Sequence, residues 1–138
     1  QIVREALHHF HGNEIKHTGD GIMASFNQAS EAIEAAMMIQ RGVAAHNIAD
    51  PTLPLQLKIG INSGEPIQED NDLFGTMVQL SARIVDKAKG NQILVSETVR
   101  GICAGKSYRF EARGAFPMKG FTGELNLYDV KWTSTNIG

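Results

Sequence analysis

The sequence has little cysteine, no large charge imbalance and no long apolar run, and each absence excludes a class of protein. Its one cysteine, Cys103, excludes an internal disulfide framework and fits a reducing compartment. Thirteen Lys and Arg residues against 15 Asp and Glu give a net charge of -2, so no basic surplus points to DNA or RNA. The longest apolar stretches are far too short to span a membrane. We therefore expect a cytoplasmic domain that contacts neither nucleic acid nor a membrane.

The length and composition suit one domain. The chain has 138 residues, of which 42% are hydrophobic, enough for a single core. We expect the domain to cover residues 1–132 and residues 133–138 to form a loose tail. Residue 1 is Gln, and helical apolar spacing is already present at Ile2, Val3, Ala6, Leu7 and Phe10. This start inside a helix predicts a fragment that lacks an N-terminal strand.

Apolar periodicity predicts helices alternating with strands. Helices are expected over 2–10, from an N-cap at Asn27 or Ser30 to about 46, over 76–89 and over 96–104. Strands are expected in a hairpin over 14–26 and at 55–61, 66–67, 93–95, 108–111 and 125–132. Gly12 is expected to end the first helix, Gly90 to occupy the C′ position of the third, and residues 114–123 to form a loop. The order predicts an α/β (α+β) sandwich with helices on a mostly antiparallel sheet.

A turn sequence at residues 19–21 carries the first chemical signal. Gly-Asp-Gly between two short apolar runs predicts a hairpin that presents the Asp20 carboxylate at its tip. Lys16 adds an ammonium group on the incoming strand. A hard carboxylate ligand beside a cation suits a phosphate-rich substrate that carries Mg²⁺. A plain structural turn is the alternative interpretation of this segment.

The second signal lies at the start of the third predicted helix. Gln79 and Arg83 are four residues apart and share a helical face, and Asp72 stands just before the helix. A carboxylate, a carboxamide and a guanidinium on one side suit a nucleotide. The alternative is a solvated helix face on which Arg83 pairs with Asp86 or Asp72.

Three strings in this order resemble the catalytic domain of class III adenylate and guanylate cyclases, with details most like bacterial members. They are Lys-x-x-Gly-Asp-Gly-x-Met-Ala from residue 16, Ile-Gly-Ile-x-x-Gly-Glu from residue 59 and Leu-Phe-Gly-x-x-Val-x-Leu-x-x-Arg from residue 73. The resemblance covers about residues 12–130. It implies a ferredoxin-like βαββαβ core with a C-terminal extension, whose first strand is missing from this chain.

The resemblance also implies roles for individual residues. Asp20 matches the second of two metal-binding aspartates, and Arg83 matches the arginine that stabilises the transition state. Lys16 and Asp72 match the pair that reads adenine, which implies ATP rather than GTP, because adenine offers an acceptor at N1 and a donor at N6. Lys119 matches the lysine that binds the triphosphate.

The chain departs from the family pattern at two places. The family usually has asparagine where this chain has Gln79, whose carboxamide is one methylene further from the backbone. The first metal aspartate belongs to the strand that is missing here, so we expect this chain alone to be inactive and the intact parent protein to be active.

The function implied is adenylate cyclase activity in signal transduction. The ribose 3′-oxygen of ATP attacks the α-phosphorus, pyrophosphate leaves, and two Mg²⁺ or Mn²⁺ ions assist. The implied site lies between two subunits of a head-to-tail homodimer. The alternative is a degenerate cyclase-homology domain that binds nucleotide or a partner and regulates another activity.

Overall fold

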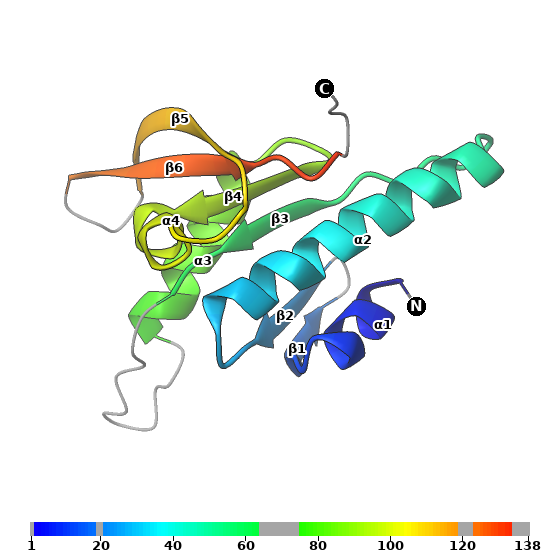
Figure 1. The fold of residues 1–138 in the computed structure, drawn as a ribbon, viewed down its shortest axis with the longest axis horizontal. Coiled ribbons are helices and arrows are strands. Elements are labelled where there is room, and N and C mark those ends of the chain that lie inside the picture. Colours follow the sequence, from blue (N-terminus) through cyan, green and yellow to red (C-terminus); the bar gives the residue numbers. More distant parts are fainter. Residues whose placement is uncertain (1, 19–20, 64–74, 119–122, 134–138) are drawn as a thin grey trace. The chain divides into compact units, whose positions relative to one another are not determined.

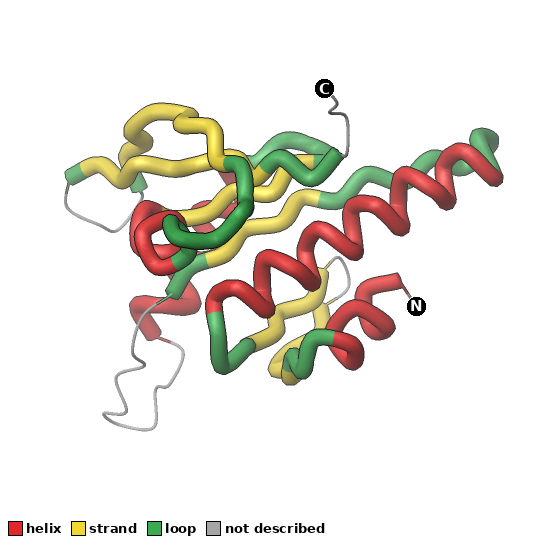
Figure 2. Tube along the Cα trace, in the orientation of Figure 1, coloured by secondary structure: helices red, strands yellow, loops and turns green. Residues whose placement is uncertain are grey.

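The chain forms two compact units, which are described separately. The structure is a computed structural model that describes residues 2–18, 21–63, 75–118 and 123–133, and only the backbone of residues 16–18 and 75–78. One unit comprises Gln1–Leu57 with Trp132–Gly138, and the other comprises Lys58–Lys131. Figure 1 labels their elements, and Figure 2 colours them by type. No helix in the described part of the chain is long and apolar enough to cross a bilayer.

The first unit contains two helices and a hairpin. Helix α1 spans Ile2–His9, strands β1 and β2 span Asn13–Thr18 and Gly21–Ser25, and helix α2 spans Ala29–Ala49. The strands pair antiparallel, so the predicted hairpin is confirmed. The core of this unit consists of buried apolar side chains from both helices. They are Ala6, Leu7, Ile33, Ala35, Ala36, Ile39 and Val43.

Gly12 lies just past the end of α1, as expected. The left-handed residue is His11, with φ of 65°, and the Gly12 N–H donates to the Leu7 carbonyl at 2.8 Å. This is the backbone pattern of a Schellman cap. Gly12 is needed for space instead, since a Cβ there would lie 2.7 Å from the Phe26 ring.

Two side chains of α2 determine where the next strand begins. Asn47 exchanges hydrogen bonds with the Leu55 backbone at 2.8 and 2.9 Å, and Gln40 Nε2 donates to the Leu57 carbonyl at 3.0 Å. The sequence pattern predicted a strand from residue 55, but the backbone groups of Leu55 and Leu57 form hydrogen bonds with side chains of α2 instead. The strand begins at Lys58. The N-cap of α2 is Gln28, without a side-chain cap, rather than Asn27 or Ser30.

The second unit is a four-stranded sheet with two helices. It contains β3 (Lys58–Ile61), α3 (Gly75–Lys87), β4 (Gln92–Ser96), α4 (Glu97–Ile102), β5 (Phe110–Pro117) and β6 (Glu124–Val130). The strand order is β3-β4-β6-β5, with β3 parallel to β4 and the other pairs antiparallel. The sheet is thus mixed, and the predicted α+β class is confirmed. The strand expected at 66–67 lies outside the described residues.

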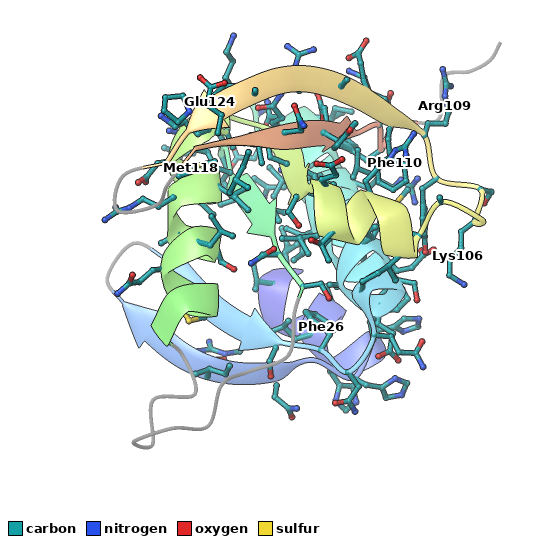
Figure 3. All side chains as sticks on the ribbon, turned by 90° about the vertical axis from the view of Figure 1, so that its left-hand side faces the viewer. Phe26, Lys106, Arg109, Phe110, Met118 and Glu124 are labelled. Carbon is teal, nitrogen blue, oxygen red and sulfur yellow. The ribbon has the colours of Figure 1, made fainter. Side chains whose placement is uncertain are left out.

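The core of this unit joins α3 to the sheet. Ile84 and Ala88 of α3 pack with Leu94, Leu127 and Met118, all of them buried. Figure 3 shows Met118 just past the end of β5, near Glu124 at the start of β6. The Ser96 hydroxyl caps α4 by accepting from the Val99 N–H at 3.3 Å, as its sequence predicts.

Two expectations for this unit are wrong. Residues 114–117 belong to β5 and not to a loop, because one irregularity between Ala112 and Gly114 lets pairing with β6 continue to Pro117. Gly114 has φ of 101°, which fits a bulge. After α3 the left-handed residue is Asn91, with φ of 68°, instead of Gly90.

Candidate functional site

The hairpin places the segment that contains Lys16 and Asp20. Lys16 is in register with Met23, and the last described pair is Thr18 with Gly21. The register shifts between Glu14 and Lys16, where one strand carries an extra residue. Such a bulge changes which face later residues occupy, and bulges are common beside functional sites. Asp20 itself is not among the residues that the structure describes.

Helix α3 carries the two candidate residues whose side chains are described. Gln79 is exposed, and the Arg83 side chain is 38% exposed one turn further along. Ile84 is fully buried against the sheet, which fixes the orientation of the helix. The four-residue spacing puts Gln79 and Arg83 on one side of α3, as the sequence predicts.

The Arg83 guanidinium is held loosely. Its Nη1 lies 3.7 Å from Asp86 Oδ2, which is an ion pair without hydrogen-bond geometry. Its Nε is buried and has no hydrogen-bond partner in the described structure. The alternative interpretation of this segment, a solvated helix face, expected Arg83 to pair with Asp86 or Asp72, and the pair with Asp86 is present. A cation with a buried, unsatisfied donor can gain by binding an anion.

A glycine that sequence reasoning did not single out supports this helix. A Cβ at Gly60 of β3 would lie 2.7 Å from Val85 Cγ2 and 2.9 Å from the Val85 backbone nitrogen. Val85 is two residues beyond Arg83. β3 therefore packs closely against the helix that carries the candidate residues. The signal was available in the sequence, because glycine inside a strand pattern indicates close backbone approach.

The remaining candidates are not placed. Asp72 and Lys119 fall in the segments 64–74 and 119–122, which the structure does not describe, as Asp20 falls in 19–20. The structure therefore places Gln79 and Arg83 one turn apart on α3, and the roles of all the candidate residues stay predictions. Within the described ranges, no group of three or more His, Cys, Asp and Glu side chains could hold a metal ion. The carboxylate of Asp20 is nevertheless a hard oxygen donor of the kind that Mg²⁺ and Mn²⁺ prefer.

Comparison with known proteins gives a consistent result. The profile of the family described as "Adenylate and Guanylate cyclase catalytic domain" matches residues 1–131. A relative from Rhizobium meliloti (strain 1021), named "Putative adenylate cyclase 3", is 35% identical over 97 residues, which is 70% of this chain and 16% of that protein. The chain thus spans about a sixth of the length of this relative.

Solved structures agree on the fold. The adenylate/guanylate cyclase/hydrolase from Silicibacter pomeroyi is 30% identical, with a TM-score of 0.83 over 94% of this chain and 78% of that one. The adenylyl cyclase CyaB from P. aeruginosa is 20% identical, with a TM-score of 0.77 over 99% of this chain and 80% of that one. At that identity the second likeness concerns the fold alone.

Proposed function

Because the chain belongs to the adenylate and guanylate cyclase catalytic domain family, we propose that it converts ATP into 3′,5′-cyclic AMP and pyrophosphate. One observation carries the proposal beyond family membership. Gln79 and Arg83 lie one turn apart on α3, and the Arg83 guanidinium has only a long ion pair and a buried, unsatisfied Nε. The guanidinium in this arrangement is suited to donate hydrogen bonds to phosphate oxygens.

The choice of ATP rests on Lys16 and Asp72. A lysine donor and an aspartate acceptor complement the N1 acceptor and the N6 amine of adenine. Guanine has a carbonyl oxygen, an acceptor, in place of the N6 amine and a protonated N1, a donor, in place of the N1 acceptor. Its donor and acceptor are therefore reversed relative to Lys16 and Asp72. The assignments come from the position of Lys16 in the first family-like string and of Asp72 directly before the third, and a substrate comparison tests them.

The reaction is an intramolecular displacement. The ribose 3′-oxygen forms a bond to the α-phosphorus, the bond between that phosphorus and the pyrophosphate oxygen breaks, and the 3′-hydroxyl proton passes to water. Arg83 neutralises charge that develops on the phosphate, Gln79 orients the ribose, and Lys119 binds the triphosphate. Asp20 would hold divalent metal, Mg²⁺ or Mn²⁺, which when bound neutralises the triphosphate and lowers the pKa of the 3′-hydroxyl.

We further propose that the two compact units form one catalytic domain over residues 1–132, which works as a head-to-tail homodimer in the cytoplasm. Asp20 of one subunit would then face Lys16, Asp72, Gln79 and Arg83 of the other. The family match runs through both units, which supports treating them as one domain. The ATP substrate and the lone thiol support a cytoplasmic location.

The test is a product assay on the protein at its natural length. It is incubated with ATP or GTP and Mn²⁺ or Mg²⁺, and cyclic nucleotide is separated from substrate by chromatography. The proposal expects cyclic AMP with ATP and at least tenfold less cyclic GMP with GTP. Lys16→Glu combined with Asp72→Cys should weaken the preference for ATP. A preference for GTP would overturn the assignment of Lys16 and Asp72.

One departure favours a second candidate, a degenerate domain that binds nucleotide and regulates another activity. Gln79 stands where the family usually has asparagine, so the ribose contact is altered. The same assay separates the two. Nucleotide binding without turnover, with either metal, favours the regulatory domain.

A further inference from the structure

Arg83 stands between two polar neighbours that lie in opposite directions along α3. Gln79 is one turn toward the N-terminus, and Asp86 is three residues toward the C-terminus. Long helical side chains ordinarily lean toward the N-terminus, which would bring Arg83 toward Gln79. The ion pair with Asp86 instead favours positions of the guanidinium on the C-terminal side.

The pair is too weak to lock the arginine. The charged atoms are 3.7 Å apart without a hydrogen bond, and the Asp86 side chain is 65% exposed. The acid is C-terminal to the base, which is the less favourable order on a helix. Among the described residues Arg83 has no other ion pair. A partner this loosely held exchanges readily for a phosphate, which carries more charge.

We propose that Asp86 is a positioning residue that holds Arg83 in a resting place, away from Gln79, until the nucleotide phosphates displace it. This inference rests on the proposed function, which puts Gln79 and Arg83 on the same nucleotide. Asp86 then competes with the phosphates for the guanidinium.

The test removes the negative charge of Asp86 and keeps the size of its side chain. Asp86→Asn at natural protein length should lower the KM for ATP about two- to fivefold, with kcat changed less than twofold. The dissociation constant of a non-cyclising ATP analogue, measured by calorimetry, should fall by the same factor. Both effects should shrink at 0.5 M salt, because the interaction is screened. Asp86→Glu, which retains the charge, should keep the wild-type KM.

Two controls separate this role from a general effect of charge. Glu124→Gln removes one exposed carboxylate from the same unit without touching Arg83, and it should leave KM unchanged. In an Arg83→Ala background, Asp86→Asn should have no further effect on the binding of the analogue. An equal fall in KM for Glu124→Gln, or a persisting effect without Arg83, would overturn the proposal.

The outcomes also separate this inference from the proposed function. Wild-type turnover with unchanged constants in Asp86→Asn overturns the role of Asp86 and leaves the cyclase proposal standing. Tighter analogue binding in Asp86→Asn without turnover in any variant supports the role of Asp86 and overturns the cyclase proposal. A wild-type protein that neither binds nor converts nucleotide overturns both.

Discussion

Gly60 of β3 lies so close to Val85 of α3 that a Cβ at position 60 would come within 2.9 Å of the Val85 backbone nitrogen. Backbone atoms cannot move aside as the end of a side chain can, so the helix itself must shift. That helix carries Gln79 and Arg83. The contact therefore links packing of the sheet to the geometry of the candidate active site.

The first prediction is that Gly60→Ala destabilises the protein by about 1–3 kcal/mol, the range for overpacking a filled site. Unfolding in urea, followed by circular dichroism, measures it. Gly105→Ala is the matched control, because a Cβ at Gly105 meets nothing within 4 Å. Equal urea midpoints for the two variants would show that β3 and α3 are not tightly seated.

The second prediction concerns Asp129, a buried carboxylate on β6, the strand that lies between β4 and β5. It is 8% exposed, and it accepts hydrogen bonds from Gln92 Nε2 at 3.1 Å and from Lys131 Nζ at 3.4 Å. Asp129→Ala leaves both donors without this acceptor and should cost about 1–3 kcal/mol. Glu124→Ala, at an exposed position of the same strand, should stay within about 0.5 kcal/mol in the same urea titration. A loss for Asp129→Ala as small as the control's would exclude a structural role for this network.

The third prediction is the pH dependence of the Glu111–Lys131 ion pair, whose atoms are 2.9 Å apart. The hydrogen bond from Lys131 lowers the pKa of Glu111 below its ordinary value of 4.5, and the same bond raises the pKa of Lys131 above 10.5. A lowered acid pKa means that its contribution is present above pH 4.5 and is lost as the pH falls through the folded value. The lysine contribution is present below pH 10.5 and is lost as the pH rises through its folded value.

Glu111→Gln should therefore reduce the free energy of unfolding between about pH 5 and 10, and the difference from wild type should vanish well below pH 4.5. Urea titrations at several pH values measure this difference. Because both side chains are exposed, the effect is small and falls with added salt. A difference that grows toward acid pH would contradict the ion pair.

The fourth prediction is that the Cys103 thiol is protected in the folded protein. The residue is fully buried, and burial raises the pKa of its thiol. Both effects slow alkylation, since the thiolate is the nucleophile. Labelling by iodoacetamide should be at least tenfold slower at Cys103 than at a cysteine introduced by Ser107→Cys, an exposed position. The two rates should converge in urea, and equal rates in buffer would show that α4 opens freely.

The fold was predictable where a pattern is local. The hairpin followed from alternating residues around Gly-Asp-Gly, and α4 followed from the Ser96 cap, whose hydroxyl does accept from Val99. Glycine was the least reliable guide. The left-handed residues beside the two predicted helix ends are His11 and Asn91. Gly12 and Gly60 are instead needed for close packing. Only the three-dimensional neighbours reveal which of these two uses a glycine serves.

For the candidate site, only the placement of two residues on one helix can be compared with the sequence prediction. Helical spacing predicted Gln79 and Arg83 on one side of a helix, and the structure confirms that both lie on α3. The ion-pair partner of Arg83 was not predictable, because the spacing was consistent with pairing to Asp86 and with pairing to Asp72. The start of β3 also depended on distant contacts, since the side chains of Gln40 and Asn47 occupy backbone groups that could otherwise have extended the strand.

The last prediction addresses Gln79, where the chain differs from the family pattern. A carboxamide that orients the ribose must hold it close to the reacting geometry, and a displacement of about 1 Å can slow such a reaction by as much as about 10²-fold. Gln79→Asn shortens the side chain by one methylene and should raise kcat with ATP by up to about tenfold. Gln79→Ala removes the carboxamide and should lower kcat below that of the wild type. Because Gln79 is exposed, neither change should move the urea midpoint appreciably. Wild-type turnover in Gln79→Ala would mean that the carboxamide does not contact the ribose, and the exposed side of α3 would then act through Arg83 alone.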